Sequence, residues 1–261
     1  MLTDQQRQDA AAALAGARES GSPIAPLRET WPDIDVVDAY EIQLIGVGEQ
    51  MAAGRQVKGH KVGLSAKAMQ QMLGVDEPDY GHLLDDMVLF ENDTVAAGSL
   101  LQPRIEVEVA FVLGAPLRGP GCTVADVLAA TDYVTASLEI IDSRVADWNI
   151  RLVDTIADNA SAGAVVLGGQ ATPVGGLDLR TIGAVLWRNG EIVATGASGA
   201  VLGNPATAVA WLANKVADFG VTLEEGHIIL PGSCTKAIDV APGDTFRAEF
   251  DQLGPVTVNF A

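Results

Sequence analysis

The stretch LQPRIEVEVAFVL, residues 101–113, is predicted to be a β-strand, and its pattern guides the interpretation of the whole chain. Successive side chains on a strand point to opposite faces. One face is apolar and carries Ile105, Val107, Val109 and Phe111. The opposite face carries Glu106 and Glu108, which alternation places about 6.6 Å apart at Cα, close enough to converge on one ion. The strand therefore sets two carboxylates side by side in the most apolar part of the sequence.

Short β-branched runs separated by Gly, Pro, Asn and Asp fill the chain from residue 57 onward, which is typical of strands. The further runs are VLFEND (88–93), VTASLEII (134–141), AGAVVLG (162–168), AVLWRNGEIVATG (184–196), GHIILPG (226–232), DTFRAEF (244–250) and PVTVNF (255–260). Asn189-Gly190 lies between two apolar runs and predicts a hairpin, because a type I′ turn needs positive φ at both positions.

Helical signals are concentrated at the start of the chain, where N-cap residues and terminal glycines mark the boundaries. Helices are predicted from Thr3 to Gly21, Asp35 to Gly54, Ser65 to Leu73, Thr123 to Ala130 and Asn204 to Gly220. The proline-rich segment 22–35 is predicted to be a loop. Helices first and strands afterwards favour an α+β fold over a doubly wound sheet. We divide the chain into a helical N-terminal segment, residues 1–56, and a β-rich domain, residues 57–261.

The composition is that of a folded globular protein, with 48% hydrophobic and 19% charged residues. The net charge of −18 argues against a nucleic-acid partner, because neutralising a phosphate backbone requires cationic groups. No apolar run approaches the roughly 20 residues that span a bilayer, and no signal-peptide pattern begins the chain. We therefore expect a cytoplasmic protein with no membrane partner. Cys122 and Cys234 lie far apart and predict neither a disulfide framework nor a thiolate zinc site.

The Glu-x-Glu pattern has two interpretations. It is either the solvated face of an antiparallel strand or a buried anionic site, which needs a cation because unpaired buried carboxylates cost several kcal/mol each. Glu139 favours the second interpretation, since it is a further carboxylate on an otherwise apolar strand. Three carboxylates without a histidine cluster are typical of a hard divalent cation, Mg²⁺ or Mn²⁺. Whether the two strands are neighbours is not decided by the pattern.

Three polar residues in the surrounding segments are further candidates. Lys61 lies in a Val-rich strand and has two interpretations. It is either a surface lysine with a buried stem, or a desolvated ammonium group that has a lowered pKa or binds an anionic substrate. Asp79 lies in the turn-like EPDYG and is either a turn residue or part of a site. Ser161 in a polar loop either binds substrate or caps the chain locally.

Several long motifs, in order from about Asp35 to the C-terminus, closely resemble one enzyme family. They are HKVGLSAKAMQQMLGVDEPDYGHLLDDM (60–87), QPRIEVEVAFVL (102–113), SLEIIDSRVADW (137–148), DTIADNASAG (154–163) and LGNPATAVAWLANK (202–215). The family comprises the 2-hydroxypenta-2,4-dienoate (2-keto-4-pentenoate) hydratases and the sister 4-oxalocrotonate decarboxylases, within the fumarylacetoacetate hydrolase superfamily. The likeness is nearest to the hydratases of aromatic and steroid ring degradation, and no motif position is missing.

Carried over position by position, the resemblance implies roles for eight residues. Glu106 and Glu108 of the PR-x-E-x-E motif and Glu139 of the LE-[IV] motif would be the metal ligands. Lys61 of [RH]K-[IV]-GL and Asp79 of P-D-[FY]-G would lie near the reacting carbons. The implied substrate contacts are Ser161, near the substrate carboxylate, with Leu84 and Arg104. The implied fold is a mixed β-roll with flanking helices, in which the β-rich domain is catalytic, and the implied assembly is a homo-oligomer, often beside an aldolase that consumes the product.

The implied reaction is the divalent-metal-dependent hydration of 2-hydroxypenta-2,4-dienoate, or a close 2-hydroxy-2,4-dienoate, to 4-hydroxy-2-oxopentanoate. A divalent ion would stabilise the negative charge that develops on the C2 oxygen of the substrate. Proton transfer at the distal carbons and orientation of the water would fall to Lys61 and Asp79.

Three alternatives remain at the level of the sequence. The nearest is decarboxylation of 2-oxo-3-hexenedioate, whose second carboxylate would need a cationic pocket from Arg104, Lys67 or Lys236. Carbon–carbon bond hydrolysis is less favoured, because no histidine is suitably placed to activate water. A non-catalytic, metal-binding accessory subunit is an alternative of another class, and it is poorly motivated because carboxylate sites with open positions hold Mg²⁺ weakly.

Overall fold

A computed structural model describes residues 1–66, 70–71, 75 and 77–261 of the chain. Positions 67–69, 72 and 73 of the predicted helix from Ser65 to Leu73, Lys67 among them, fall outside these described residues. None of the helices in the described ranges has the length and apolar character needed to cross a bilayer.

Four helices lie where the capping signals predict them, whereas two short helices, Leu27–Thr30 and Leu152–Ala157, lie where no helix is predicted. Their bounds are α1 Asp4–Ser20, α2 Leu27–Thr30, α3 Val36–Ala52, α5 Val124–Ala130, α6 Leu152–Ala157 and α7 Pro205–Ala217. Thr3 forms the predicted capping box with Gln6, because its hydroxyl accepts from the Gln6 amide. The segment 22–35 is mostly irregular as predicted, but it contains the short helix α2, which begins directly after Pro26.

The strands form two sheets, each with both antiparallel and parallel pairs. Their bounds are β1 Val57–Gly63, β2 Asp79–Leu84, β3 Val88–Leu89, β4 Thr94–Val95, β5 Pro103–Leu113, β6 Thr131–Asp142, β7 Ala162–Leu167, β8 Gly183–Arg188, β9 Glu191–Ala197, β10 Ile228–Leu230, β11 Ile238–Asp239, β12 Thr245–Phe250 and β13 Gly254–Phe260. The larger sheet has the order β2-β1-β10-β5-β6-β7-β3 with β11 beside β5, and the smaller has the order β4-β13-β12-β8-β9. Asn189 and Gly190 both have positive φ in the β8–β9 hairpin, as predicted.

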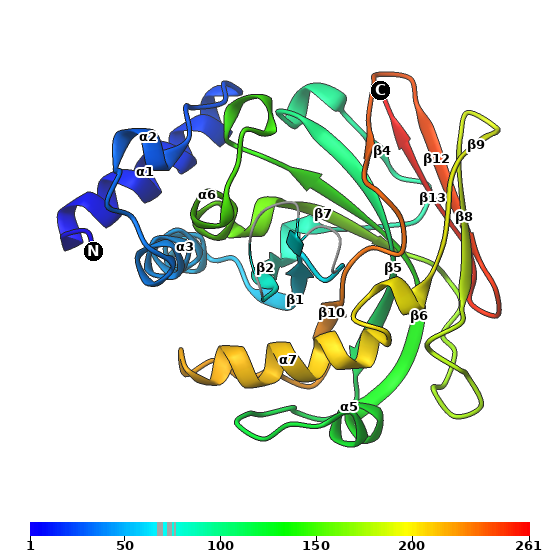
Figure 1. The fold of residues 1–261 in the computed structure, drawn as a ribbon. Coiled ribbons are helices and arrows are strands. Elements are labelled where there is room, and N and C mark those ends of the chain that lie inside the picture. The colour runs from blue at the N-terminus through cyan, green and yellow to red at the C-terminus, as the bar shows by residue number, and fades with distance from the viewer. Residues whose placement is uncertain (67–69, 72–74, 76) are drawn as a thin grey trace.

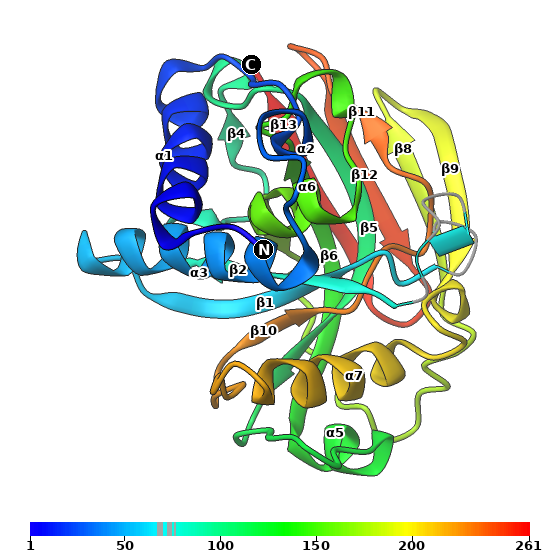
Figure 2. The same cartoon turned by 60° about the vertical axis from the view of Figure 1, so that its left-hand side comes forward.

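The two sheets and the helices surround a common apolar core. β12 and β13 contact β6, so the smaller sheet packs on the apolar face of the larger one. Figures 1 and 2 show the N-terminal helices at one end of the molecule and the smaller sheet at the other. α3 packs against both α1 and α6, so the N-terminal helices also contact the rest of the chain. The fold is α+β with a mixed β-roll, as expected, and the division at residue 56 stays a prediction.

The long strands β5 and β6 are central to the larger sheet and antiparallel to each other. Their register pairs Glu106 with Glu139 and Glu108 with Ser137. On β5 the predicted alternation is confirmed, since the apolar face is completely buried against the core. The opposite face of the same strands therefore brings all three glutamates to one place.

Candidate active site

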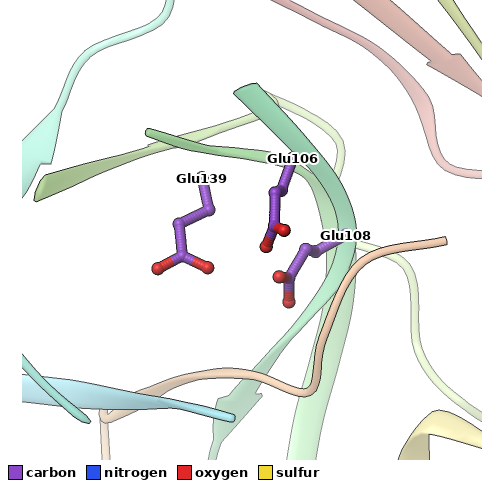
Figure 3. Close-up of side chains that lie close together, drawn as sticks. All are labelled: Glu106, Glu108 and Glu139. Atoms are coloured by element: carbon purple, nitrogen blue, oxygen red, sulfur yellow. The ribbon is translucent and has the colours of Figure 1, made fainter. Parts of the chain in front are cut away.

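The three glutamates form a compact carboxylate cluster. Ligand oxygens of Glu106, Glu108 and Glu139 all lie within 4.8 Å of one another, and Figure 3 shows the side chains of the two β5 residues facing that of Glu139. Glu108 and Glu139 are fully buried, so the interpretation as a solvated strand face is wrong for these residues. Cross-strand pairing, which the sequence pattern left open, is the reason that they meet.

Lys61 extends from β1 into the same site. Its side chain is 3% exposed, and its Nζ lies 3.3 Å from Glu139 Oε1 and donates to the Ala160 carbonyl at 2.9 Å. Burial alone would lower the pKa of Lys61, but the surrounding carboxylates, Glu139 foremost, outweigh burial and raise it. The expected lowered pKa is therefore wrong, and so is the surface-lysine interpretation. Lys61 is a buried, charged ammonium group.

Asp79 begins β2 and lies directly across from Gly63 on β1. The carboxyl group is buried, and the neighbouring Thr155 and Gly63 act to lower its pKa. Burial raises the pKa of Asp79, although Lys61 opposes the shift. A side chain at Gly63 would overlap the carboxylate, so the close pairing of the two strands requires glycine there. Asp79 is thus a site residue and not merely a turn former.

The cavity beside the cluster has a volume of about 390 Å³. Five of the predicted site residues line it: Lys61, Asp79, Arg104, Glu106 and Ser161. Its wall also includes Trp148 and Ile150, which supply an apolar surface next to the charged groups. A cavity that combines an apolar wall with a few polar groups is the usual form of a small-molecule site.

Leu84 does not belong to this cavity. It ends β2, five residues beyond Asp79, and a strand rises about 3.3 Å per residue, which separates the two by roughly 16 Å. Leu84 instead lines a smaller hollow with Met87 and Arg144. The expectation that Leu84 contacts the substrate is not supported by this placement, because the strand carries it away from the glutamates.

Arg104 lies on β5 on the same face as Glu106 and lines the cavity, but its charge is already matched. Its Nε donates to Asp239 at 2.7 Å, and its guanidinium stacks 4.4 Å from the centre of the Trp148 ring. Lys236 also lines the cavity and is exposed. Two of the three cationic groups predicted for a second substrate carboxylate, Arg104 and Lys236, thus line the cavity, and Arg104 is paired with Asp239.

The oxygen atoms of the three-glutamate cluster have the chemistry that a hard divalent cation requires. Glu108 Oε1, both oxygens of Glu139, Asp79 Oδ1 and Ser161 Oγ are buried without a hydrogen-bond partner among the described residues. Burial, opposed by Lys61 and reinforced by Glu139, raises the pKa of Glu106 to about 7, and burial raises the pKa of Glu108 further still. Buried carboxylates that repel one another are stabilised by a cation, and oxygen-only ligation suits Mg²⁺, Mn²⁺ or Ca²⁺.

A family model described as "Fumarylacetoacetate (FAA) hydrolase C-terminal" matches residues 51–261. The chain belongs to the fumarylacetoacetate hydrolase family. A "2-keto-4-pentenoate hydratase" of Paraburkholderia xenovorans (strain LB400) is 48% identical over 99% of this chain and 96% of the relative. A "2-oxo-hept-4-ene-1,7-dioate hydratase" of Escherichia coli is 44% identical over 94% of each chain.

A solved structure supports the same assignment to this family. The "4-oxalocrotonate decarboxylase from Pseudomonas putida G7 - complexed with magnesium and adipate" has a TM-score of 0.97 and 37% identity, and it covers 100% of this chain and 99% of its own. Family membership is therefore supported by both sequence and fold, and the resemblance of the motifs is confirmed.

Sequence reasoning missed several residues that support the site. The Gly232 amide donates to Glu108 Oε2 at 2.7 Å, and Ser233 accepts from the amide of Val107, which lies between Glu106 and Glu108. Thr155 lines the cavity with Asp79 and acts to lower its pKa. The Pro-Gly-Ser turn after β10 was a usable signal for a loop near the site, but its approach to β5 depends on the tertiary fold.

Proposed function

We propose that this protein is a divalent-metal-dependent hydro-lyase that adds water to 2-hydroxypenta-2,4-dienoate, or a close 2-hydroxy-2,4-dienoate, to give 4-hydroxy-2-oxopentanoate in aromatic or steroid ring breakdown. The observation that carries the proposal is the buried three-glutamate cluster beside Lys61 and Asp79 at one cavity. Near-complete alignment with a 2-keto-4-pentenoate hydratase supports the same reaction class.

Glu106, Glu108 and Glu139 would hold Mg²⁺ or Mn²⁺ in this proposal. When bound, such an ion would neutralise the negative charge that develops on the C2 oxygen of the substrate during ketonisation. The Gly232 amide keeps one oxygen of Glu108 oriented and leaves Oε1 free to act as a ligand. The neighbouring structure in complex with magnesium supports this choice of ion.

Asp79 is proposed to move the protons. Burial raises the pKa of Asp79 and so favours its protonated carboxyl, and Oδ1 has no partner among the described residues. Asp79 would give its proton to C5 of the dienol as the C2 hydroxyl releases its own proton to water, and would then, as a carboxylate, accept a proton from the water that attacks C4. C3 of the resulting enolate would take up a proton, which balances the one that the C2 hydroxyl released. The overall reaction therefore adds one water, restores Asp79 and consumes no net acid or base.

Lys61 and Ser161 are proposed to position the reactants. An ammonium group has three N–H donors. Lys61 Nζ donates to the Ala160 carbonyl and lies 3.3 Å from Glu139 Oε1, and the side chain lines the cavity, so we propose that a further donor faces the cavity. The donor that faces the cavity would orient the attacking water. The unpartnered Ser161 hydroxyl would bind the substrate carboxylate.

The decarboxylase alternative requires a partner for a second substrate carboxylate. Arg104 is a poor candidate, because its ion pair with Asp239 already satisfies its charge. Lys236 is exposed at the cavity, so it would bind a second carboxylate weakly. These two observations favour hydration of a substrate with a single carboxylate.

The identity of the products tests the proposal. Purified protein with Mg²⁺ is offered 2-hydroxypenta-2,4-dienoate and 2-oxo-3-hexenedioate in separate reactions, and the products are identified by mass. We expect the dienol to gain one water and the diacid to keep its CO₂. Release of CO₂ from the diacid without hydration of the dienol would establish the decarboxylase, and no reaction with either would support an accessory role.

Self-association and a downstream aldolase are further parts of the proposal and rest on the family resemblance alone. A cytoplasmic location is also proposed, and it rests on the sequence pattern. Gel filtration with light scattering tests self-association. A mass equal to a single chain would contradict a homo-oligomer.

A further inference from the structure

The turn Asn159–Ser161 next to the cavity has an unfavourable backbone conformation. All three residues have positive φ, of 53°, 50° and 54°, although none is glycine. This left-handed conformation costs about 1–2 kcal/mol per residue with a Cβ, and asparagine tolerates it best. Consecutive residues persist in it only where surrounding contacts hold them.

Asn159 supplies these contacts through its amide. Its Oδ1 accepts from the His82 amide at 2.7 Å, and its Nδ2 donates to the His82 carbonyl at 2.9 Å. His82 lies on β2, the terminal strand of the larger sheet, so the side chain satisfies backbone groups at the sheet edge. A Cβ at Gly81 would overlap the Asn159 carbonyl, so glycine at 81 permits the approach.

The turn delivers two groups to the proposed active site. The Ala160 carbonyl accepts from Lys61 Nζ at 2.9 Å, and Ser161 Oγ is buried at the cavity without a partner in the described part of the chain. Directly before the turn, Asp158 forms a buried ion pair with Arg144. The Asn159 amide is therefore the link between the turn and the strand that begins with Asp79.

We propose that Asn159 is a positioning residue of the active site, whose amide clamps the left-handed turn on His82 and so sets the places of Lys61 and Ser161. The inference rests on the proposed function as far as turnover is concerned. An aspartate at 159 would lose the donor and face the His82 carbonyl with a carboxylate, so the clamp requires an amide.

A matched control exists elsewhere in the molecule. Asn214 on α7 makes the same pair of bonds to the backbone of Cys122, at 2.8 and 2.9 Å, and does not line the cavity. Asn159→Ala and Asn214→Ala thus remove the same chemistry from two places. Gly81→Ala disturbs the clamp from the strand side and serves as a second variant if Asn159→Ala fails to fold.

The test measures kcat and KM for the dienol, the Kd for Mg²⁺ by calorimetry and the free energy of unfolding for each variant. We expect Asn159→Ala to lower kcat about 100-fold, because a 1 Å misplacement of a reacting group has an effect of that order. The Kd for Mg²⁺ should stay unchanged, since β5 and β6 are untouched. Asn214→Ala should lose similar stability and keep its kcat. Wild-type kcat in folded Asn159→Ala, or an equal loss in both variants, would overturn the proposal.

A second readout does not depend on turnover. Amine acetylation by acetic anhydride, followed by peptide mass, compares buried Lys61 with exposed Lys58 on the same strand in the presence of Mg²⁺. Asn159→Ala should speed acetylation of Lys61 several-fold while that of Lys58 stays constant, and Asn214→Ala should change neither. If wild-type protein turns over no dienol, the proposed function fails, but this readout still decides the clamp. Unchanged Lys61 acetylation in Asn159→Ala would refute it.

Discussion

Lys61→Met removes an ammonium from the buried site while it keeps most of the side-chain volume. The Nζ lies 3.3 Å from Glu139 Oε1, and the lysine is 3% exposed. At an effective dielectric constant of about 20, two unit charges at this distance attract by about 5 kcal/mol. Loss of one partner from a buried ion pair typically costs about 3–5 kcal/mol. We expect the metal-free variant to lose about 3–5 kcal/mol of unfolding free energy.

Metal binding and turnover should respond to the same substitution in opposite directions. Without the neighbouring positive charge the three-glutamate cluster attracts a divalent cation more strongly, so the affinity for Mg²⁺ should rise, and Mg²⁺ should restore part of the lost stability. Loss of a group that orients the reacting water should lower kcat about 10²- to 10⁴-fold. A variant with a higher Mg²⁺ affinity and a lower kcat would show that Lys61 acts in turnover and does not hold the metal.

Urea unfolding in EDTA and in Mg²⁺, calorimetric Mg²⁺ titration and initial rates measure these effects. Lys58→Met is the matched control, because Lys58 lies on the same strand, is exposed and bonds only to Gln56 among the described residues. Wild-type kcat in Lys61→Met would refute the reasoning. So would a loss of Mg²⁺ affinity that the control does not share.

Three further predictions concern the ligands and the buried charges. Glu106→Gln and Glu108→Gln should each weaken Mg²⁺ binding in calorimetry and abolish Mg²⁺-dependent turnover; an unchanged isotherm would contradict the assignment of that residue. Arg144→Met leaves the buried Asp158 carboxylate without its ion-pair partner and should lower the free energy of unfolding in urea by about 3–5 kcal/mol. An unchanged urea midpoint would show that the ion pair does not stabilise the fold. Burial lowers the pKa of His82 to about 4, so His82 is protonated at higher pH in the unfolded chain than in the folded one. The free energy of unfolding should therefore fall by at most about 3 kcal/mol as the pH drops from about 6.5 to 4. The urea midpoint of His82→Phe should depend less on pH in this range, and the same pH dependence as wild type would contradict the role of His82.

The sequence predicted most of the elements and the shared face of Glu106 and Glu108, because both depend on local patterns. Alternation on β5 separates Glu106 and Glu108 from the apolar core face, and capping boxes mark the starts of α1 and α3. These signals span only a few residues, so they can be recognised without knowledge of the tertiary fold.

The remaining features depend on contacts between distant segments. The pairing of Glu106 with Glu139 follows from the β5–β6 register, and the raised pKa of Lys61 follows from carboxylates that the fold brings around it. The amide of Asn159 meets the backbone of His82 across 77 positions. No local pattern encodes such distances. Leu84 is a different case. The family resemblance implies that it contacts the substrate, but the direction of β2 carries it away from the cavity.

The central claim is that the three glutamates hold the ion on which hydration depends. The most direct test is the initial rate at which metal-stripped protein consumes 2-hydroxypenta-2,4-dienoate, followed by loss of dienol absorbance as Mg²⁺ is added, for wild type and Glu106→Gln. We predict no enzymatic rate in EDTA, a saturable rise with Mg²⁺ in wild type and no rise in the variant. Full turnover of wild type in EDTA, or an equal rise in both proteins, would contradict the claim.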